Sequence, residues 1–415
     1  MSTASASGNR ARSPLAYPAF RALWLASIVS YVGTFVQQVG EAWLMMDLTS
    51  SPLPVAMLAT AFVGASLFAL LPAGILADRY PRRNVAIASL VVQAVAATGM
   101  AGLAFTGHIT PGALVFGVAL LGLGMALGSP AWTALLPDLV SRELVADAVA
   151  MNAVAFNLAR AVGPAIGGIV LARFGATASF ALNAASFAVV IVALAAYRNA
   201  RDDAPRPANP PMLSAFAEPW RLVVRAGHLR PVFLAMFGFT FGAGMFYALT
   251  PAFGKQTLGA TPLAFGLMIG AMGAGAVAGA SLMKLLRARM APGRLVVAAM
   301  LVFAAAIMLL SRVSSVPLAM ALLVPAGAGW LGVFSSLQAL VQIWSPEPLR
   351  ARVTSLYMLL HLGTWAASSA LAGTMADHFG VRAAIFTGAL VCALAALSTG
   401  RSGLPPSFTG NPGTV

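Results

Sequence analysis

Charged residues are scarce in this chain, and acidic residues are scarcer still. Of its 415 residues, 9% are charged and 60% are hydrophobic, and Asp and Glu together number 11. A water-soluble globular domain cannot cover its surface with so little charge, so that class of protein is excluded. The mean hydropathy of +0.87 instead predicts a polytopic helical membrane protein.

Cysteine is almost absent. Cys392 is the only cysteine and lies in an apolar run, so neither a disulfide within one chain nor a cysteine-based metal site is possible. No apolar run combines a nucleophile, a base and an orienting group, or a cluster of metal ligands. The glycine-rich stretch 270–279 lacks the Lys-Ser/Thr ending of a phosphate loop. We therefore disfavour a membrane enzyme and expect no metal, no cofactor and no nucleotide site.

Basic residues outnumber acidic ones and give a net charge of +14. In a soluble chain this excess would suggest nucleic acid as a partner, but these arginines occupy short loops between apolar runs and form no basic face. Of the 25 Lys and Arg residues, Arg160 lies inside a predicted span. Four lie on one side of the membrane, namely Arg173, Lys255, Arg312 and Arg382, and the other twenty lie on the opposite side. The positive-inside rule then places both termini in the cytoplasm, with the chain in a bacterial cytoplasmic (inner) membrane.

Long apolar runs are abundant. Each bilayer crossing needs about 20 largely apolar residues, and turn or charge clusters divide the chain into twelve such runs. The predicted spans are 20–45, 53–77, 84–105, 111–136, 144–171, 176–197, 231–253, 262–286, 295–310, 316–343, 354–375 and 381–397. The first run is too long for a cleaved signal segment, so it should remain as a helix.

The apolar signal stops between residues 198 and 230, where prolines and charges predict an irregular linker. Residues 212–225 mix apolar and charged side chains and are suited to lie along the membrane face. The expected organisation is a cytoplasmic N-terminal segment (1–19), a six-helix bundle (20–197), a cytoplasmic linker (198–230), a second six-helix bundle (231–397) and a cytoplasmic tail (398–415). A shift of about 205 residues places Gly168 over Gly373 and Gly175 over Gly380, which indicates a weak internal repeat.

The loop after the second span carries a charge cluster of defined spacing. Residues 74–83 read Gly-Ile-Leu-Ala-Asp-Arg-Tyr-Pro-Arg-Arg. Arginine beside a membrane helix is common, but this does not explain the Gly, the Asp and the Pro. The stretch resembles the Gly-x-Leu-Ala-Asp-Arg-x-Pro-Arg-Arg loop of the major facilitator superfamily at every consensus position. The resemblance implies an all-α membrane protein with twelve transmembrane helices in two pseudo-symmetric six-helix bundles, which transports a substrate between them by alternating access.

The superfamily arrangement also implies a gate. It places the end of the second helix beside the start of the eleventh, where unpaired backbone donors and the helix dipole attract an anion. Asp78 is therefore expected to latch the two halves near Arg352, and the arginines of the loop are interpreted as topology anchors with lipid contacts. The expected conformational gate comprises Gly74, Asp78, Arg79, Arg82, Arg83 and Arg352.

Polar residues recur at helical spacing in several spans, which is costly in lipid and implies a cavity or a bundle interior. In the first span five of them fall on one face, and interhelical hydrogen bonding is the alternative to a cavity wall. Similar stripes occur in the seventh, tenth and eleventh spans. The residues expected to line the substrate cavity are Tyr31, Thr34, Gln38, Glu41, Asn157, Arg160, Thr240, Tyr247, Gln338, Tyr357, His361 and Thr364.

Three of these residues are candidates for proton coupling, namely Glu41, His361 and Arg160. His361 is the only histidine well inside a span, and imidazole titrates near neutrality; a neutral hydrogen-bonding role is the equal alternative. An unpaired guanidinium in a membrane helix is expensive, so Arg160 should face the cavity or a carboxylate. By helix position Asp147 and Glu41 are the nearest acids.

The fifth span contains Gly163, Pro164, Gly167 and Gly168. The spacing resembles the Gly-Pro-x-x-Gly-Gly motif of facilitator-type exporters, although alanines replace its earlier glycines. Small residues four apart let another helix approach closely, and the proline removes a backbone donor and bends the helix. Gly and Pro are also frequent in membrane helices generally. The resemblance favours export over uptake.

Stretches 33–52, 130–147, 273–276 and 342–356 extend the resemblance to the enterobactin-exporter-like branch of drug and proton antiporters. This similarity implies a secondary transporter that exports a small amphipathic molecule, such as a drug, a siderophore or another metabolite, against proton entry. The alternative is a proton-coupled uptake symporter. The fourth span lacks the arginine that many such exporters carry there, a role that Arg160 could take. We expect a monomer whose partners are a small-molecule substrate, protons and membrane lipids, with no nucleic acid.

Overall fold

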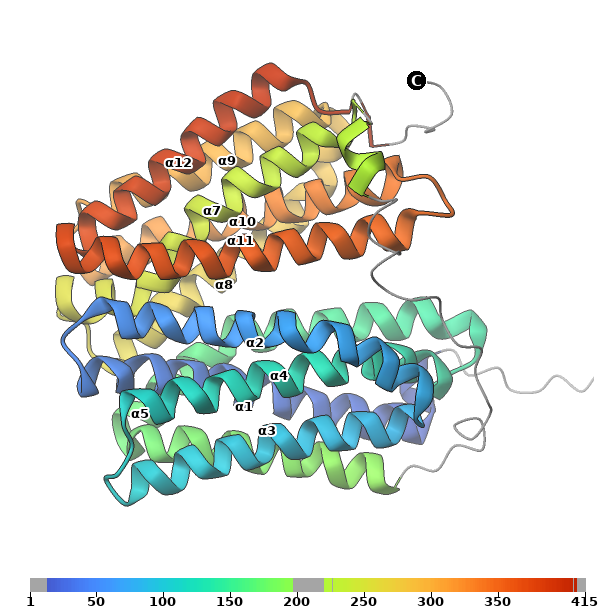
Figure 1. Cartoon of the computed structure of the whole chain (residues 1–415), viewed down its shortest axis with the longest axis vertical. Helices are drawn as coiled ribbons and strands as arrows, with labels where there is room; N and C mark the ends of the chain where they lie inside the picture. Colours follow the sequence, from blue (N-terminus) through green and yellow to red (C-terminus); the bar gives the residue numbers. More distant parts are fainter. Residues whose placement is uncertain (1–12, 197–219, 226, 406, 409–415) are drawn as a thin grey trace, which may run out of the picture.

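The computed structural model describes residues 13–196, 220–225, 227–405 and 407–408, except for the side chains of residues 70, 71, 74, 75, 77, 78, 136, 137 and 284. Every regular element in this part of the chain is a helix (Figure 1). The long helices are α1 (Pro18–Leu48), α2 (Pro52–Arg79), α3 (Arg82–Phe105), α4 (Pro111–Leu135), α5 (Val145–Ala196), α7 (Arg230–Ala252), α8 (Pro262–Arg289), α9 (Pro292–Leu310), α10 (Val316–Trp344), α11 (Arg350–Phe379) and α12 (Val381–Ser402). Short helical turns are η1 (Pro14–Ala16), η2 (Leu136–Leu139), η3 (Arg142–Leu144) and η5 (Phe253–Thr257).

The element α5 is two membrane helices joined end to end. Its 52 residues are about twice what one bilayer crossing requires. The backbone leaves helical values at Gly175, where φ is 76° and ψ is 178°, a conformation that glycine adopts at little cost. Counting α5 twice gives twelve long helices among the described residues, so the predicted all-α, twelve-helix fold is confirmed.

Hydropathy alone identifies ten stretches in the described part of the chain that are long and apolar enough to cross a membrane. One of them covers both helices of α5, and α11 is not among them. The absence of α11 from this set has a simple cause: it is the most polar of the long helices and carries His361, several hydroxyl groups and terminal charges. A polar spanning helix is tolerated where neighbouring helices cover its polar face.

The turns that begin the second helix of each half have the same design. α2 begins with Pro52 and α8 with Pro262, whose fixed φ and missing N–H both suit a first helical position. Ser51 caps α2 by accepting a hydrogen bond from a backbone N–H of its first turn, and Thr261 caps α8 in the same way. These caps fix the first residues of the two helices by local hydrogen bonds.

The helices form two bundles, which we call the N-half (α1 to α5) and the C-half (α7 to α12) (Figure 1). In the N-half α1 packs against α5, and α4 packs against α2 and α3. In the C-half α7 packs against α11 and α12, and α10 packs against α8 and α9. The halves meet where α5 contacts α8 and where α2 contacts α11. We call the side where α5 ends and α7 begins the linker side, and the opposite side, which carries residues 49–51 and 253–261, the far side.

Pairs of glycines 205 residues apart occupy equivalent positions in the two halves. Gly175 and Gly380 both have positive φ, at 76° and 85°, each between the last two helices of its half. A Cβ on Gly122 would lie 2.1 Å from a backbone oxygen of α2, and one on Gly327 would lie 1.9 Å from a backbone oxygen of α8. Both glycines therefore let the second and fourth helices of their half touch at the backbone. The pseudo-symmetry that the repeat predicts is present in the structure.

Residues 1–12, 197–219 and 409–415 lie outside the described residues. The predicted N-terminal segment, most of the linker and the end of the tail fall in these ranges. Of the stretch predicted to lie along the membrane face, residues 220–225 are described and are helical, with Val223 buried and Trp220 half exposed.

Candidate functional site

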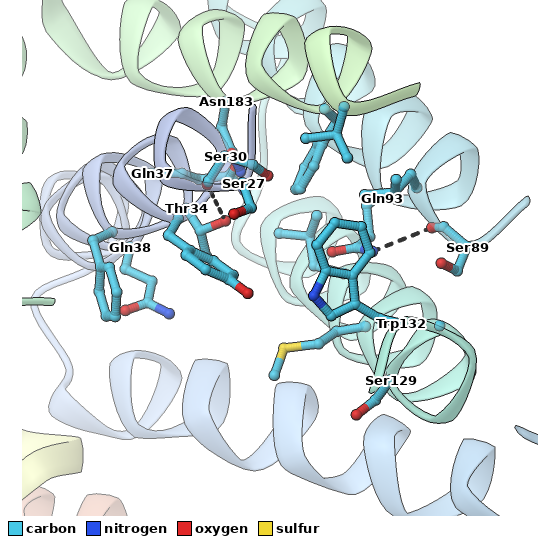
Figure 2. A pocket seen from close by; sticks show the side chains of 18 of the residues that line it. Ser27, Ser30, Thr34, Gln37, Gln38, Ser89, Gln93, Ser129, Trp132 and Asn183 are labelled. Atoms are coloured by element: carbon cyan, nitrogen blue, oxygen red, sulfur yellow. Dashed lines mark hydrogen bonds between the residues drawn. The ribbon is translucent and has the colours of Figure 1, made fainter. Parts of the chain in front are cut away.

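A polar cavity of about 350 Å³ lies inside the N-half. It occupies the space between α1 and α4, and α3 and the second helix of α5 complete its walls. Figure 2 shows Thr34 and Gln38 of α1 across the cavity from Gln93 and Trp132. The cavity extends from the level of Glu41 to residues near the linker-side ends of α1, α3 and α4. All four residues of α1 that were predicted to line a cavity, Tyr31, Thr34, Gln38 and Glu41, lie on its wall.

Glu41 stands at the end of a buried chain of hydrogen bonds. Ser186 donates to the side-chain oxygen of Asn183 over 3.0 Å, and Asn183 donates in turn to Gln37 over 2.7 Å. The amide of Gln37 lies 3.5 Å from a carboxyl oxygen of Glu41, which is at the outer limit of a hydrogen bond. The carboxyl group is buried, with 8% of the residue exposed. A buried acid that is so weakly held can gain or lose a proton without breaking a strong contact.

A second cavity, of about 330 Å³, lies between the two halves. Its walls include Arg160 of α5 on one side and Tyr247, Trp330 and Trp365 of α7, α10 and α11 on the other. Three residues of α1 and α5 line both cavities, so the two cavities adjoin; these are Phe35, Gln38 and Phe156. A molecule between the halves can therefore also reach the polar compartment that holds Glu41.

Arg160 reaches across from the N-half to the C-half. Its guanidinium lies over the ring of Trp330, with Cζ 4.2 Å from the ring centroid, and Tyr247 lies beside it on the wall of the same cavity. Of its two expected placements, facing the cavity or facing a carboxylate, the structure shows the first, because the arginine extends toward α7 and α10 and lines the cavity between the halves. The ion pairs among the described residues are Arg82 with Asp138 and Lys255 with Asp47.

Five rings of the C-half form a closed cluster beside Arg160, which we call the aromatic box. Trp330 and Phe334 are stacked, with centroids 5.5 Å apart and planes at 3°. Phe334 contacts His361 at 5.2 Å, and His361 contacts Trp365 at 5.9 Å. Tyr247 closes the circuit, at 5.0 Å from Trp365 and 6.0 Å from Trp330. Tyr247 and His361 were among the residues expected to line the cavity, whereas Trp330, Phe334 and Trp365 were not singled out by the sequence.

The polar stripe of α11 was expected to face the substrate cavity, but it faces the interior of the C-half. Tyr357 is fully buried, and its ring packs edge-on against Phe233 at 5.7 Å. His361 Nδ1 lies 2.9 Å from the hydroxyl of Thr240, and Thr364 is buried. The space near Tyr357, His361 and Thr240 is only about 10 Å³, too small for a substrate. Helical spacing identifies a polar face, but here α7 covers most of that face.

Two further predicted lining residues lie outside both cavities. Asn157 is exposed and donates to the backbone oxygen of Ala153 in its own helix, and Gln338 is half-buried on α10. Asn152, one and a half turns before Asn157, instead accepts a hydrogen bond from Tyr31 at 3.1 Å. The sequence stripe on α5 is thus rotated with respect to the cavity, although Arg160 remains on its wall.

The arginines of the signature loop bind within the N-half. Arg82 donates to the backbone oxygen of Ala134 and to Asp138, at 2.8 and 2.9 Å, and Arg83 donates to the backbone oxygen of Leu194 at 2.7 Å. Both arginines cap the carboxyl ends of helices, where the dipole favours a cation. Their role as topology anchors with lipid contacts stays a prediction. Arg79 lies 5.9 Å from the ring of Tyr80.

The remaining members of the expected gate are Gly74, Asp78 and Arg352. Gly74 and the side chain of Asp78 lie outside the described residues, although both positions fall within α2. Arg352 lies in the first turn of α11. The latch between Asp78 and the start of α11 therefore stays a prediction.

The glycines of the fifth span lie at close helix contacts, two of them with α1 in the same half and one with α8 in the other half. A Cβ on Gly163 would lie 2.6 Å from Phe35 of α1, and one on Gly168 would lie 2.8 Å from the backbone oxygen of Pro262 of α8. Gly167 likewise faces α1, at 3.0 Å from Val36. The backbone at Pro164 keeps helical dihedral angles, and the break inside α5 occurs at Gly175. Close helix packing is therefore the main structural effect of the motif in this state.

Contacts on the far side hold the halves together, and sequence reasoning did not find them. Lys255 donates to Asp47, Gln256 donates to the backbone oxygen of Ser50 at 2.6 Å, and Ser51 donates to Asp377 at 2.8 Å. Each contact joins residues more than 200 positions apart. Toward the linker side α2 and α11 diverge (Figure 1).

Two pseudo-symmetric six-helix bundles with a cavity between them define a membrane transporter of the major facilitator fold. Among the described residues no group of three or more His, Cys, Asp or Glu side chains could hold a metal ion.

The chain belongs to the transmembrane secretion effector family of this superfamily, whose family model matches residues 9–410. It is 28% identical over 369 residues to the enterobactin exporter EntS of Escherichia coli O1:K1 / APEC, covering 86% of this chain and 85% of that protein. It is 31% identical over 209 residues to the enterobactin exporter EntS of Shigella boydii serotype 18, covering 48% of each chain. These similarities place it in the EntS-like branch.

Solved structures with the same fold include a bacterial homolog of the human lysosomal transporter Spinster in its occupied form, with a TM-score of 0.77 and 13% identity over 93% of this chain and 96% of that one. A D-xylose-proton symporter matches with a TM-score of 0.72 and 13% identity over 93% of this chain and 98% of that chain. At this level of identity the likeness shows the fold alone.

Proposed function

We propose that this protein is a proton-coupled exporter of a small amphipathic molecule. The placement of Glu41 carries the proposal: an acid lies buried on the wall of a cavity that adjoins the space between the halves. The relatives named as enterobactin exporters support export as the direction and a siderophore or a compound of similar character as the substrate. Protons supply the energy, and the working unit is a monomer in the bacterial inner membrane.

The linker side is the cytoplasmic side in this proposal. The excess of Lys and Arg in the loops and chain ends of that side supports this orientation. The polar cavity extends toward it, and the hydrogen bonds between Gln256 and Ser50 and between Ser51 and Asp377 lie on the opposite side. The state described above is then inward-facing, ready to take substrate from the cytoplasm.

Exchange at Glu41 couples the two fluxes. In the inward-facing state substrate enters the adjoining cavities and Glu41 releases its proton to the cytoplasm. The far-side contacts then break, the linker side closes, and substrate leaves to the outside. A proton that reaches Glu41 from outside neutralises the buried charge and favours the return step, because an uncompensated carboxylate is costly inside a helical bundle.

A ligand screen followed by a proton measurement tests this proposal. Purified protein is heated with siderophores, macrolides and planar dyes, and ligands are recognised by a raised unfolding temperature because they bind the folded state. The best ligand is then added to the protein in weakly buffered solution. Antiport predicts that binding releases protons. Proton uptake on binding would instead support the alternative, an inward symporter.

A further inference from the structure

The cavity between the halves combines a cation with a wall of aromatic rings. Arg160 lies at the boundary, and its described neighbours are the ring of Trp330 and Tyr247. A guanidinium carries five N–H donors, more than one tyrosine oxygen can use. The arginine therefore retains donors for a further acceptor while it lines the cavity.

The aromatic residues come from both halves. Trp330 and Tyr247 face the cavity from the aromatic box, and Phe35 and Phe156 face it from the N-half, where their rings are 5.7 Å apart. Flat apolar walls of this kind bind planar rings through dispersion and edge contacts. The cation stands at the rim of the box, 4.2 Å from the indole of Trp330, so a ring that enters would present its substituents to Arg160.

We propose that this cavity binds an aromatic acid, with the acidic group on Arg160 and the ring against the aromatic box. The inference deepens the proposed function, on which it rests, by naming the chemical class of the substrate. A carboxylate or sulfonate accepts two parallel N–H bonds from a guanidinium, and an ionised phenol accepts a charge-assisted bond on its single oxygen. The anion also compensates the half-buried positive charge, which a neutral ligand cannot do.

The arrangement gives Arg160 a role in both the empty and the loaded transporter. In the empty cavity the ring of Trp330 partly stabilises the guanidinium by a cation–π contact. A bound acid replaces that weaker partner with a charge-assisted pair. The polar compartment around Gln38 and Glu41 then takes the hydrogen-bonding remainder of the molecule, because Gln38 lines both cavities.

The test compares three probes on the purified full-length protein in detergent at neutral pH. 2-Naphthoate supplies ring and charge, 2-naphthamide supplies the ring alone, and cyclohexanecarboxylate supplies the charge alone. Dissociation constants are measured by quenching of tryptophan fluorescence and checked by calorimetry. We expect 2-naphthoate to bind about tenfold or more tightly than either of the other two, the factor that one charged hydrogen bond supplies.

Variants identify the residues. Arg160→Gln should bring the constants for the acid and the amide within about twofold of each other, and Trp330→Leu should weaken both. Arg312→Gln is the matched control, because Arg312 also lies over a ring, that of Phe386 at 5.4 Å, but lines neither cavity. If Arg160→Gln does not fold, Arg160→Lys serves in its place: lysine keeps the charge but lacks the planar pair of N–H donors, so the preference for the acid should fall.

Several outcomes would overturn the inference. Equal binding of acid and amide by the wild type, or no binding of either at millimolar concentration, would do so. A preference for the acid that survives in Arg160→Gln would also overturn it. If that variant also lost thermal stability, the arginine would be only a structural bridge between the halves. These measurements report affinity and not proton release or uptake, so their results are independent of the proton-release test of export.

Discussion

At the scale of single residues, two ionisable side chains that line the cavities have contrasting environments. Glu41 ends a chain of amide and hydroxyl groups and has a single long hydrogen bond. Arg160 lies between the halves on an aromatic surface. One is suited to hold a proton and the other to hold an anion, and the adjoining cavities place both within the reach of one small molecule.

Replacement of Glu41 tests the proton-coupling proposal directly. Glu41→Gln should bind substrate with nearly unchanged affinity but lose uphill transport, because glutamine keeps the shape and hydrogen bonding but cannot gain or lose a proton. Accumulation in energised proteoliposomes provides the measurement. Glu347→Gln, at an exposed acid between α10 and α11, is the control and should transport normally.

The same experiment applies to His361, which bonds Thr240 and belongs to the aromatic box. His361→Gln keeps a hydrogen-bonding group but removes the titratable ring. Undiminished uphill transport by Glu41→Gln and, separately, by His361→Gln would remove both residues from the coupling mechanism.

At the scale of helices, close backbone contact determines how the elements pack. Glycines on α4, α5, α10 and α11 stand where a neighbouring helix leaves no room for a Cβ. In lipid no hydrophobic effect drives helices together, so close contact and dispersion hold them. The two halves use the same device at positions 205 residues apart, at Gly122 and Gly327 and at Gly168 and Gly373.

A single methyl group should therefore destabilise the fold. Gly327→Ala would place its Cβ 1.9 Å from a backbone oxygen of α8, and we expect a loss of about 1–3 kcal/mol, the usual cost of overpacking. Thermal unfolding in detergent measures it. Gly363→Ala in α11 is the control: nothing lies within 4 Å of its Cβ, so its unfolding temperature should stay the same or rise slightly. Equal unfolding temperatures of the two variants would contradict this packing account.

The sequence predicts where the helices lie along the chain better than it predicts which neighbouring helix packs against each face. Apolar runs and their breaks identified twelve helices because length and hydropathy are local properties. The polar stripe of α1 was located correctly beside a cavity. The stripe of α11 has the same periodicity, yet Tyr357 packs against Phe233 inside the C-half, because periodicity defines a face but not the neighbour that covers it. The cross-half position of Arg160 and the far-side contacts depend on residues far apart in sequence and had no local signal.

At the scale of the whole molecule, different contacts close the two sides of the transporter. On the far side Lys255 pairs with Asp47 and lies 4.9 Å from the ring of Trp43. On the linker side we propose that Asp78 binds the start of α11 only when that side closes. Alternating access requires that one set of contacts forms as the other breaks.

Neutral replacements at the two ends should shift the equilibrium in opposite directions. Asp78→Asn should favour the state open on the linker side by about 1–3 kcal/mol, because a charged contact with backbone donors is lost. Lys255→Gln should favour the state open on the far side, by about 0–1 kcal/mol because the pair is partly exposed. Distances between spin labels on the linker-side ends of α2 and α11, and on the far-side ends of α1 and α7, report both shifts.

Arg382 serves as the control for this experiment. Arg382→Gln removes far-side bonds that lie within the C-half. It should not alter the distances. If Asp78→Asn left the distance distribution and the turnover rate at wild-type values, the latch would be wrong.

The direction of proton-driven flux tests the central claim most directly. Membrane vesicles are prepared right side out and everted, energised by respiration, and given a radiolabelled form of the compound that stabilises the protein most. An exporter should accumulate it in everted vesicles, where the cytoplasmic face points outward, and a protonophore or Glu41→Gln should abolish the accumulation. Protonophore-sensitive accumulation in right-side-out vesicles instead would contradict export and identify an uptake symporter.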